Sequence, residues 1–349
     1  MAVDSIRFLD AVAGLPEQLD AAHELAGSLD LSTLPKPDEI DSIAVLGMGG
    51  SGIAGDVLAA VGSALPVPVV VLKQYRTPAF IGPRTLVYAM SFSGNTEETV
   101  SMTRGAFDSG AHVVTVASGG ALDALASERG GLRIPCPTDI PVPRAALGAL
   151  VAPLFVSLFR MGIYPEAHAS LVKAQEQLKH RRDQCRPEVE GGKNPARELA
   201  RRIGRTIPLV YGGGALGAVA ARRFKNDVNE NAKAPAFWAA YPELNHNEIC
   251  AWGQHGDVTR QVFTLVQLRH GFEHGRLSKQ VALAREMLDE IFVQVLEVEA
   301  EGDGRLAQLL DLMYLGTWAS CYLALDNDVD PGPIDAIAQL KAGMGPLDS

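Results

Sequence analysis

The segment GMGGSG, residues 47–52, directly follows the apolar run SIAVL and constrains the fold more than any other stretch of the chain. An apolar strand that leads through a glycine-rich turn into a helix is typical of α/β folds. Gly47, Gly49 and Gly52 match G-x-G-x-x-G, a spacing that lets the backbone approach an anion closely. Free N–H groups at the start of the next helix favour negative charge, so the segment predicts a phosphate-binding loop.

The alternation of strands and helices continues beyond this loop. Apolar runs at 68–73, 85–92 and 112–118 predict strands, and helices are expected from Ser51 to about Ala60 and from Asn95 onwards. Buried apolar strands that alternate with helices favour a parallel sheet covered on both faces. We therefore predict an α/β protein built as an αβα sandwich, with a mainly parallel sheet flanked by helices.

The same pattern starts again in the second half. IPLVYGGGALG, residues 207–217, repeats the order of strand, glycines and helix, and Asn194 before Pro195 predicts the start of another helix. A further strand is expected at 258–270, and helices are expected at about 276–290, 304–326 and 333–342. The repeat predicts two similar αβα halves.

Composition shifts suggest where these halves begin and end. We expect N-terminal helices at 1–39, a first domain with the phosphate loop at 40–165, and a helical, charged linker at 166–194. The second domain with the C-terminal helices then covers 195–349.

Charge and cysteine usage exclude several classes of partner. The net charge of −10 leaves no broad basic field for nucleic acid or an anionic membrane. The four cysteines are scattered without a C-x-x-C pair, which favours reduced thiols. The chain shows neither a signal-peptide pattern nor a run of transmembrane length, so we expect a cytoplasmic protein.

A dinucleotide enzyme is one alternative for the glycine loop. It requires an acid about 20 residues further on, at the end of the second strand, to hold the ribose hydroxyls. Here that strand ends at Lys73 and Gln74, and no acid stands between Asp56 and Glu97. A nicotinamide oxidoreductase is therefore weakened, although Lys73 or Arg76 would suit a 2′-phosphate.

The stretch SFSGNTEET, residues 91–99, is a second candidate phosphate loop. Ser91, Ser93 and Thr96 bring hydroxyl groups to a turn that runs from a strand into a helix. With Ser51 from the first loop, two such corners would surround one phosphoryl group. The alternative is that Asn95 caps the helix in a capping box with Glu98.

Together, GMGGSGIAGD and SFSGNTEET resemble the sugar isomerase (SIS) fold and, more narrowly, the bifunctional phosphoglucose/phosphomannose isomerases. VPRAALGAL (142–150), NDVNENAKAP (226–235), YPELNHNEI (241–249) and the C-terminal segment 322–341 extend the resemblance. It implies two SIS domains, a homodimer, a sugar phosphate substrate, and a phosphate pocket made by Ser51, Ser93 and Thr96 with Ser91 nearby. The loop glycines of that pocket are Gly47, Gly49, Gly50, Gly52 and Gly94.

The resemblance also implies catalytic residues and a reaction. Glu230 would move a proton between C1 and C2, and His246, from the neighbouring subunit, would open the sugar ring. Arg144 would stabilise the enediolate, and Lys341 would assist ring opening or bind an oxygen. This chemistry needs neither a metal nor an organic cofactor, and Glu248 is expected to support rather than react.

One departure concerns substrate choice. Dual-specificity members carry a threonine in the last segment, whereas Ile334 stands near that point here, so use of mannose 6-phosphate is open. A non-catalytic SIS protein that senses a sugar phosphate is another alternative. It is disfavoured because both Glu230 and His246 stand in their motifs.

Overall fold

The computed structural model describes residues 3–63 and 65–345, which divide into two compact units. We call residues 14–175 the N-terminal unit, and residues 3–13 with 176–345 the C-terminal unit. This division follows packing, whereas the domain boundaries expected above follow composition, and those boundaries stay predictions.

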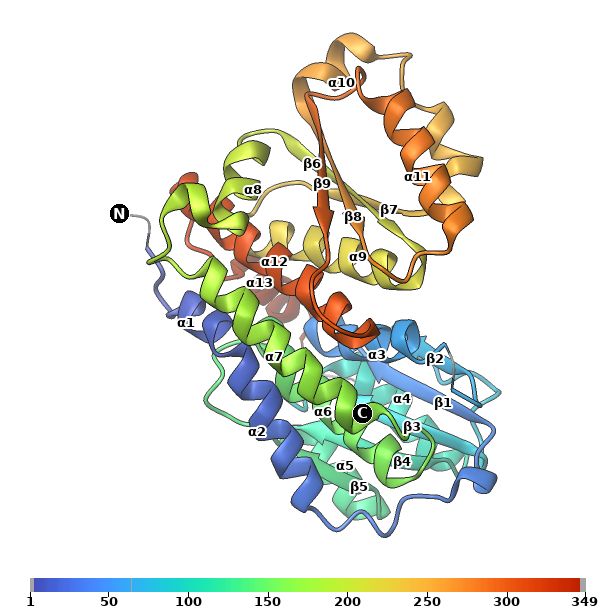
Figure 1. The fold of residues 1–349 in the computed structure, drawn as a ribbon. Coiled ribbons are helices and arrows are strands. Elements are labelled where there is room, and N and C mark those ends of the chain that lie inside the picture. Colours follow the sequence, from blue (N-terminus) through green and yellow to red (C-terminus); the bar gives the residue numbers. More distant parts are fainter. Residues whose placement is uncertain (1–2, 64, 346–349) are drawn as a thin grey trace. The chain divides into compact units, whose positions relative to one another are not determined.

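The N-terminal unit contains a five-stranded sheet in the order β2-β1-β3-β4-β5, with every neighbouring pair parallel (Figure 1). Its strands are β1 (Ser42–Gly47), β2 (Val69–Leu72), β3 (Thr85–Met90), β4 (His112–Ala117) and β5 (Leu132–Pro135). Its helices are α2 (Leu15–Ser28), α3 (Gly49–Val61), α4 (Glu97–Asp108), α5 (Gly120–Arg129) and α6 (Leu147–Arg160), with short 3₁₀ turns η1 (Pro37–Glu39) and η2 (Pro143–Ala145). The boundary between the units falls within α7 (Ala167–Cys185).

The C-terminal unit contains a four-stranded parallel sheet in the order β7-β6-β8-β9. Its strands are β6 (Ile207–Gly213), β7 (Phe237–Tyr241), β8 (Phe263–Arg269) and β9 (Gln294–Glu299). Its helices are α1 (Phe8–Ala13), α8 (Pro195–Ile203), α9 (Gly214–Asn231), α10 (Gly256–Val262), α11 (Gly275–Leu288), α12 (Arg305–Asp326) and α13 (Asp335–Met344). Three 3₁₀ turns complete it: η3 (Gly191–Lys193), η4 (Glu243–His246) and η5 (Glu248–Cys250).

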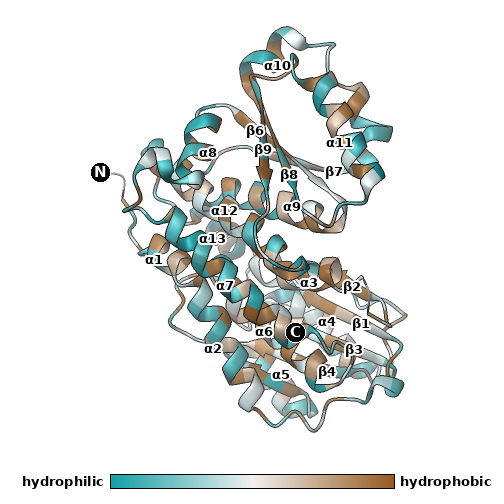
Figure 2. Ribbon diagram, in the orientation of Figure 1, coloured by the Kyte–Doolittle hydropathy of each residue, from teal (hydrophilic) through white to brown (hydrophobic). Residues whose placement is uncertain are grey.

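The predicted fold class is confirmed, because both sheets are parallel and flanked by helices. In Figure 2 the central strands of the first sheet are predominantly brown, and all six residues of β3 are buried. A strand buried on both faces reads as a continuous apolar run rather than an alternation, which is why the sequence signal was clear. The predicted helix start at Asn194 is also confirmed, since its side chain accepts hydrogen bonds from the N–H groups of Ala196 and Arg197.

The structure differs from the sequence-based elements at the sheet edges. β5, β7 and β9 were not predicted, and each is an edge strand. β5 and β9 mix polar with apolar residues, and β7 is a short apolar run, FWAAY, so none gives the long apolar run of the central strands. The expectation of a strand across 258–270 is wrong for its first part, where α10 ends at Val262 and β8 starts at Phe263. The Thr259 hydroxyl donates to the Ile291 carbonyl at 2.8 Å, so a tertiary contact accompanies the helix there.

None of the helices within 3–63 and 65–345 has the length and apolar character that crossing a membrane requires.

Candidate functional site

The first glycine loop joins β1 to α3 with backbone atoms in direct contact. A Cβ atom added to Gly52 would lie 2.3 Å from the Gly47 carbonyl oxygen, so only glycine fits there. Gly49 has a φ of +48°, in the left-handed region that side chains disfavour. A Cβ on Gly50 would lie 2.9 Å from the Cα of Arg144, so η2 packs directly on this loop.

The second loop, residues 91–96, leaves β3 next to the first. β1 and β3 are neighbours in register, with Gly47 opposite Met90, so both loops emerge at the same carboxyl edge of the sheet. Ligands of open α/β sheets bind at that edge. Gly94 has a φ of +70°, and a Cβ there would lie 1.7 Å from the Gly119 carbonyl oxygen, which fixes the loop against the turn after β4.

Hydroxyl groups tie the two loops together. The Phe92 N–H donates to Ser51 Oγ at 3.0 Å, and Ser91 Oγ lies 2.9 Å from Thr96 Oγ1. Ser51 and Ser91 are buried, whereas Ser93 is exposed and Thr96 is partly exposed. Ser93 and Thr96 therefore have accessible side chains, and the two buried serines bond to residues of the second loop.

The capping alternative for Asn95 is wrong. The N-cap of α4 is Thr96, and its side chain makes no capping hydrogen bond within the part of the chain that the structure describes. Asn95 Oδ1 instead accepts from the Ala121 N–H at 2.9 Å, across to the start of α5. Its side chain therefore ties two loops together, and the first turn of α4 faces the hydroxyl groups described above.

We call Ser51, Ser91, Ser93 and Thr96 the phosphate cup, and Arg144 lies beside the first of its loops. The Arg144 side chain is only 3% exposed, and its backbone packs against Gly50. Two helix N-termini would supply positive potential for a phosphate in a chain of net charge −10.

The topology disfavours the dinucleotide alternative. The order 2-1-3-4-5 is that of flavodoxin-like sheets, whereas dinucleotide enzymes use the order 3-2-1-4-5-6. Lys73, one of the two cations considered for a 2′-phosphate, forms an ion pair with the buried Asp56 on α3. That pairing neutralises the charge which a 2′-phosphate would need.

The second glycine loop repeats the geometry of the first. A Cβ on Gly212 would lie 1.9 Å from the Gly217 carbonyl oxygen, and Gly214 has a φ of +60°. The internal repeat seen in the sequence is therefore also present in the backbone.

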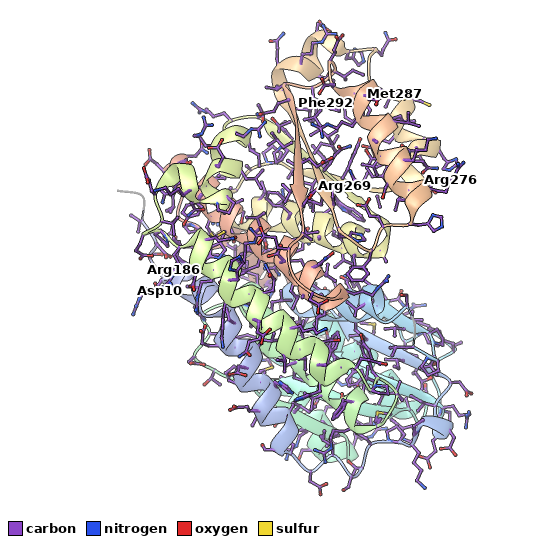
Figure 3. All side chains as sticks on the ribbon, viewed as in Figure 1. Asp10, Arg186, Arg269, Arg276, Met287 and Phe292 are labelled. Carbon is purple, nitrogen blue, oxygen red and sulfur yellow. The ribbon has the colours of Figure 1, made fainter. Side chains whose placement is uncertain are left out.

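A carboxylate, however, already lies against this second loop. A Cβ on Gly213 would lie 3.0 Å from Glu273 Oε1. Arg269, labelled in Figure 3, donates to Glu273 at 2.8 Å, and Ser278 Oγ donates at 3.0 Å. Burial alone would raise the pKa of the Glu273 carboxyl, but these hydrogen bonds hold it below its ordinary value. The second loop thus packs against a carboxylate that is ion-paired with Arg269, and a phosphate at this loop would meet carboxylate oxygens.

Glu230 lies on α9, which buried polar contacts fix to α12. Arg223 Nε and Thr317 Oγ1 both donate to Asp227 Oδ2, at 2.8 and 2.6 Å. Asn231 Nδ2 donates to Ser320 Oγ at 2.9 Å. Residues four apart lie on one helix face, so the buried face of the NDVNENAK motif leaves Glu230 on another.

A cavity of about 550 Å³ lies beside Glu230 in the C-terminal unit. Asn229, Glu230 and Lys233 line one side, and residues between Val329 and Ile337 line the other. Ile334, noted above for substrate choice, is part of this lining. Sequence reasoning did not single out Lys233 or the lining residues of the 329–337 segment, because the two sides of the cavity lie far apart along the chain.

The two remaining catalytic candidates of the C-terminal unit are both exposed. His246 is exposed at the end of η4, and Lys341 is exposed in the last turn of α13. Neither is among the described residues that line the Glu230 cavity. Glu248 accepts a hydrogen bond from the Tyr211 hydroxyl at 2.6 Å, which suits the supporting role expected for it.

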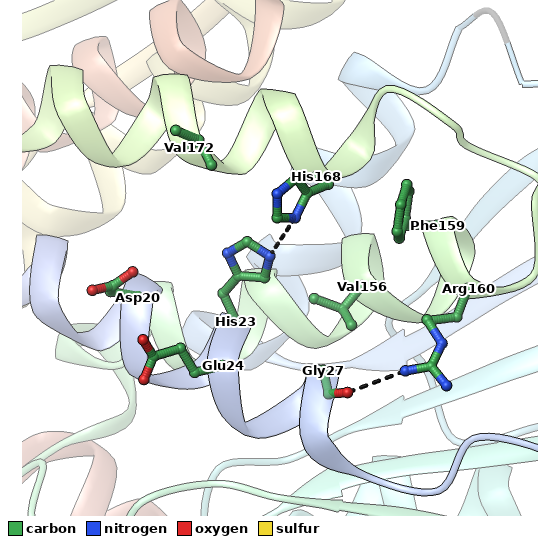
Figure 4. A pocket seen from close by; sticks show the side chains of 9 residues that line it. All are labelled: Asp20, His23, Glu24, Gly27, Val156, Phe159, Arg160, His168 and Val172. Atoms are coloured by element: carbon green, nitrogen blue, oxygen red, sulfur yellow. Dashed lines mark hydrogen bonds between the residues drawn. The ribbon is translucent and has the colours of Figure 1, made fainter.

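A further cavity, of about 490 Å³, lies among α2, α6 and α7 of the N-terminal unit (Figure 4). His23 Nε2 and His168 Nδ1 share a hydrogen bond of 2.9 Å there. Burial first, and His168 second, lower the pKa of His23, while Asp20 and Glu24 oppose the change. This pair contains none of the predicted site residues.

Comparisons with known proteins identify relatives over most of the chain. Residues 192–344 match the family described as bacterial phospho-glucose isomerase C-terminal SIS domain. A bifunctional phosphoglucose/phosphomannose isomerase of Caldicellulosiruptor bescii is 32% identical, over 95% of this chain and 97% of the relative. The protein of that name in Aquifex aeolicus is also 32% identical, over 86% of this chain and 89% of the relative.

A solved structure shares the fold. The glucose-6-phosphate isomerase like protein of Thermus thermophilus matches with a TM-score of 0.59 and 23% identity, over 95% of this chain and 96% of its own. The motifs, the two-sheet fold and the identity over nearly the whole length lead to one conclusion: this chain belongs to the bifunctional phosphoglucose/phosphomannose isomerase family.

Proposed function

We propose that this chain is a cofactor-free aldose–ketose isomerase that interconverts glucose 6-phosphate and fructose 6-phosphate. The observation that carries the proposal is the phosphate cup, where two strand–loop–helix corners meet at one sheet edge. Its exposed hydroxyl groups and its two helix N-termini suit a single phosphoryl group rather than a dinucleotide. The family relationship supplies the reaction class.

Within the cup, the hydrogen bonds suggest two kinds of role. Ser93 and Thr96 contact the phosphate oxygens, together with N–H groups at the start of α4. The buried Ser51 and Ser91 support the second loop. Ser51 Oγ accepts the Phe92 N–H, and Ser91 Oγ pairs with the Thr96 hydroxyl. Ser51 keeps a hydroxyl hydrogen that it can donate, since its oxygen is the acceptor in that contact.

The proposed chemistry balances without an external oxidant. After His246 and Lys341 open the ring, the Glu230 carboxylate takes the proton from C2 of the aldose. The C2–H electrons form the C1=C2 bond, and the C1=O π electrons move to O1, which gives the cis-enediolate. Glu230 then returns its proton to C1 while the O2 proton passes to O1 and the O2–H electrons form the C2=O bond of the ketose, and Arg144 stabilises the charge that develops on the enediolate oxygens.

The substrate set is best tested directly. Purified protein is assayed with fructose 6-phosphate, glucose 6-phosphate and mannose 6-phosphate, with EDTA and without added metal. Turnover of the glucose–fructose pair supports the proposal, whereas binding without turnover supports the sensing alternative. Ile334 lines the Glu230 cavity, so mannose 6-phosphate is the substrate whose rate depends most on this side chain.

We also propose that the active form is a homodimer in which His246 serves the neighbouring subunit. Its exposure at the end of η4 is compatible with that role. Mixing Glu230→Gln with His246→Ala protein would then restore about a quarter of the activity, since half of the dimers carry one intact site. No recovery after mixing would place both groups in one chain. We place the enzyme in the cytoplasm, where its free cysteines would stay reduced.

A further inference from the structure

The cavity beside Glu230 is closed on one side by a loop that Lys233 contacts directly. Lys233 Nζ donates to the carbonyl oxygen of Asp330 at 2.7 Å and to that of Asn231 at 3.3 Å. One ammonium group therefore joins the end of the helix that carries Glu230 to the Val329–Ile334 segment, which we call the wall loop. Both segments line the same cavity.

The backbone at Lys233 is unusual for a lysine. Its φ is +52°, and it directly follows Ala232, the C-cap of α9. Glycine or asparagine normally occupies this position, because a Cβ atom disfavours the left-handed conformation. A lysine that accepts this conformation points to a task for its side chain rather than for the turn alone.

The wall loop is also held from its other side. Asp330 Oδ1 accepts from the Gly332 N–H at 2.9 Å, and Asp330 Oδ2 accepts from the Ser5 N–H at 3.2 Å. A Cβ on Gly332 would lie 2.4 Å from Ile6 Cγ1, so this glycine packs tightly on the N-terminal segment. The loop is thus fixed at Asp330 by its carbonyl oxygen on one side and by its carboxylate on the other.

We propose that Lys233 is a positioning residue: its ammonium group holds the wall loop, with Ile334, at the distance from Glu230 that the sugar chain requires. The inference rests on the proposed isomerase function. In this role Lys233 acts on the reaction through the shape of the cavity rather than by transferring a proton. Misplacement of a positioning group by about 1 Å can cost a hundredfold in rate.

Three variants separate this role from a purely structural one. Lys233→Met removes the donor, Lys233→Arg keeps a donor, and Lys233→Gly removes the donor while relieving the backbone conformation. Lys225→Met is the matched control, because Lys225 lies on the same helix and donates only weakly, at 3.5 Å, to the neighbouring Asn226.

Three measurements are made on each variant: the kcat/KM for fructose 6-phosphate, the hydrogen exchange of the wall-loop amides, and the inhibition by inorganic phosphate. We expect Lys233→Met and Lys233→Gly to lower kcat/KM about tenfold or more and to speed exchange in the wall loop. Lys233→Arg should recover most of both losses, and Lys225→Met should resemble the wild type. Inhibition by inorganic phosphate, which reports on the phosphate cup, should stay within about twofold in all of them.

The outcomes that would overturn the inference are distinct. Unchanged exchange in Lys233→Met would show that the lysine does not hold the loop, and full activity in Lys233→Gly would show that only the turn matters. If the wild type itself showed no isomerase turnover, the proposed function would fail, and the exchange data would still decide whether Lys233 holds the wall loop.

Discussion

Substituting alanine at Gly52 tests the phosphate cup through the contact between β1 and α3. The new Cβ atom would lie 2.3 Å from the Gly47 carbonyl oxygen, 0.7 Å inside the 3.0 Å that real contacts almost never go below. The start of α3 must therefore move away by about that amount, and this movement also displaces Ser51, the residue before Gly52. A shift of 0.7 Å would stretch the 3.0 Å hydrogen bond between Phe92 N–H and Ser51 Oγ beyond useful length.

Two separate effects follow, one on stability and one on phosphate binding. Overpacking of this corner should lower the free energy of unfolding by about 1–3 kcal/mol. The displaced Ser51 hydroxyl would also no longer donate to the phosphate. Loss of one hydrogen bond to a charged phosphate costs about 1.5–3 kcal/mol, which raises both the KM for fructose 6-phosphate and the Ki for inorganic phosphate by about 10- to 100-fold. Steady-state kinetics with phosphate as a competitive inhibitor measures both constants, and urea unfolding measures the stability.

Gly217→Ala is the matched control in the second glycine loop. Its Cβ would lie 2.7 Å from the Gly212 carbonyl carbon, so it introduces a similar clash at the equivalent corner. Because Glu273 lies against that loop, we expect a comparable loss of stability with the Ki for phosphate unchanged. The reasoning is refuted if Gly217→Ala weakens phosphate inhibition as much as Gly52→Ala, or if Gly52→Ala leaves it intact.

Three further predictions concern other residues. Glu230→Gln should lower kcat by about 10²- to 10⁴-fold, while the Kd for fructose 6-phosphate measured by calorimetry stays near that of the wild type. Near-normal turnover would exclude Glu230 as the base. Ser93→Ala should raise KM far more than it lowers kcat, so a change confined to kcat would count against phosphate binding by Ser93. Because the pKa of His23 is lowered in the folded protein, the unfolded chain binds a proton at His23 more readily, so the free energy of unfolding should fall as pH drops below about 6.5. Urea unfolding of His23→Gln should show a weaker dependence of stability on pH, and an unchanged dependence would contradict the argument.

The parts of the site that the sequence predicted are those that depend on local pattern. Gly47 and Gly52 are needed because the backbones of β1 and α3 are in contact there, and the two glycines lie close together in the sequence. Asn95 shows the limit: a capping box was a reasonable local interpretation, yet its side chain binds the N–H of Ala121 in a different loop. Local propensity was overruled by a contact that only the sheet order creates.

Sequence by itself therefore determined the α/β class, the repeated strand–glycine–helix corners and the candidate phosphate-binding hydroxyl groups, since apolar runs and glycine spacing depend on residues close together in the chain. Only the tertiary structure decided that Glu273 lies against the second corner and that Lys233 reaches the carbonyl oxygen of Asp330, 97 residues away. Such contacts join segments that meet through strand order and helix packing. Their energies depend on distances that no local pattern specifies.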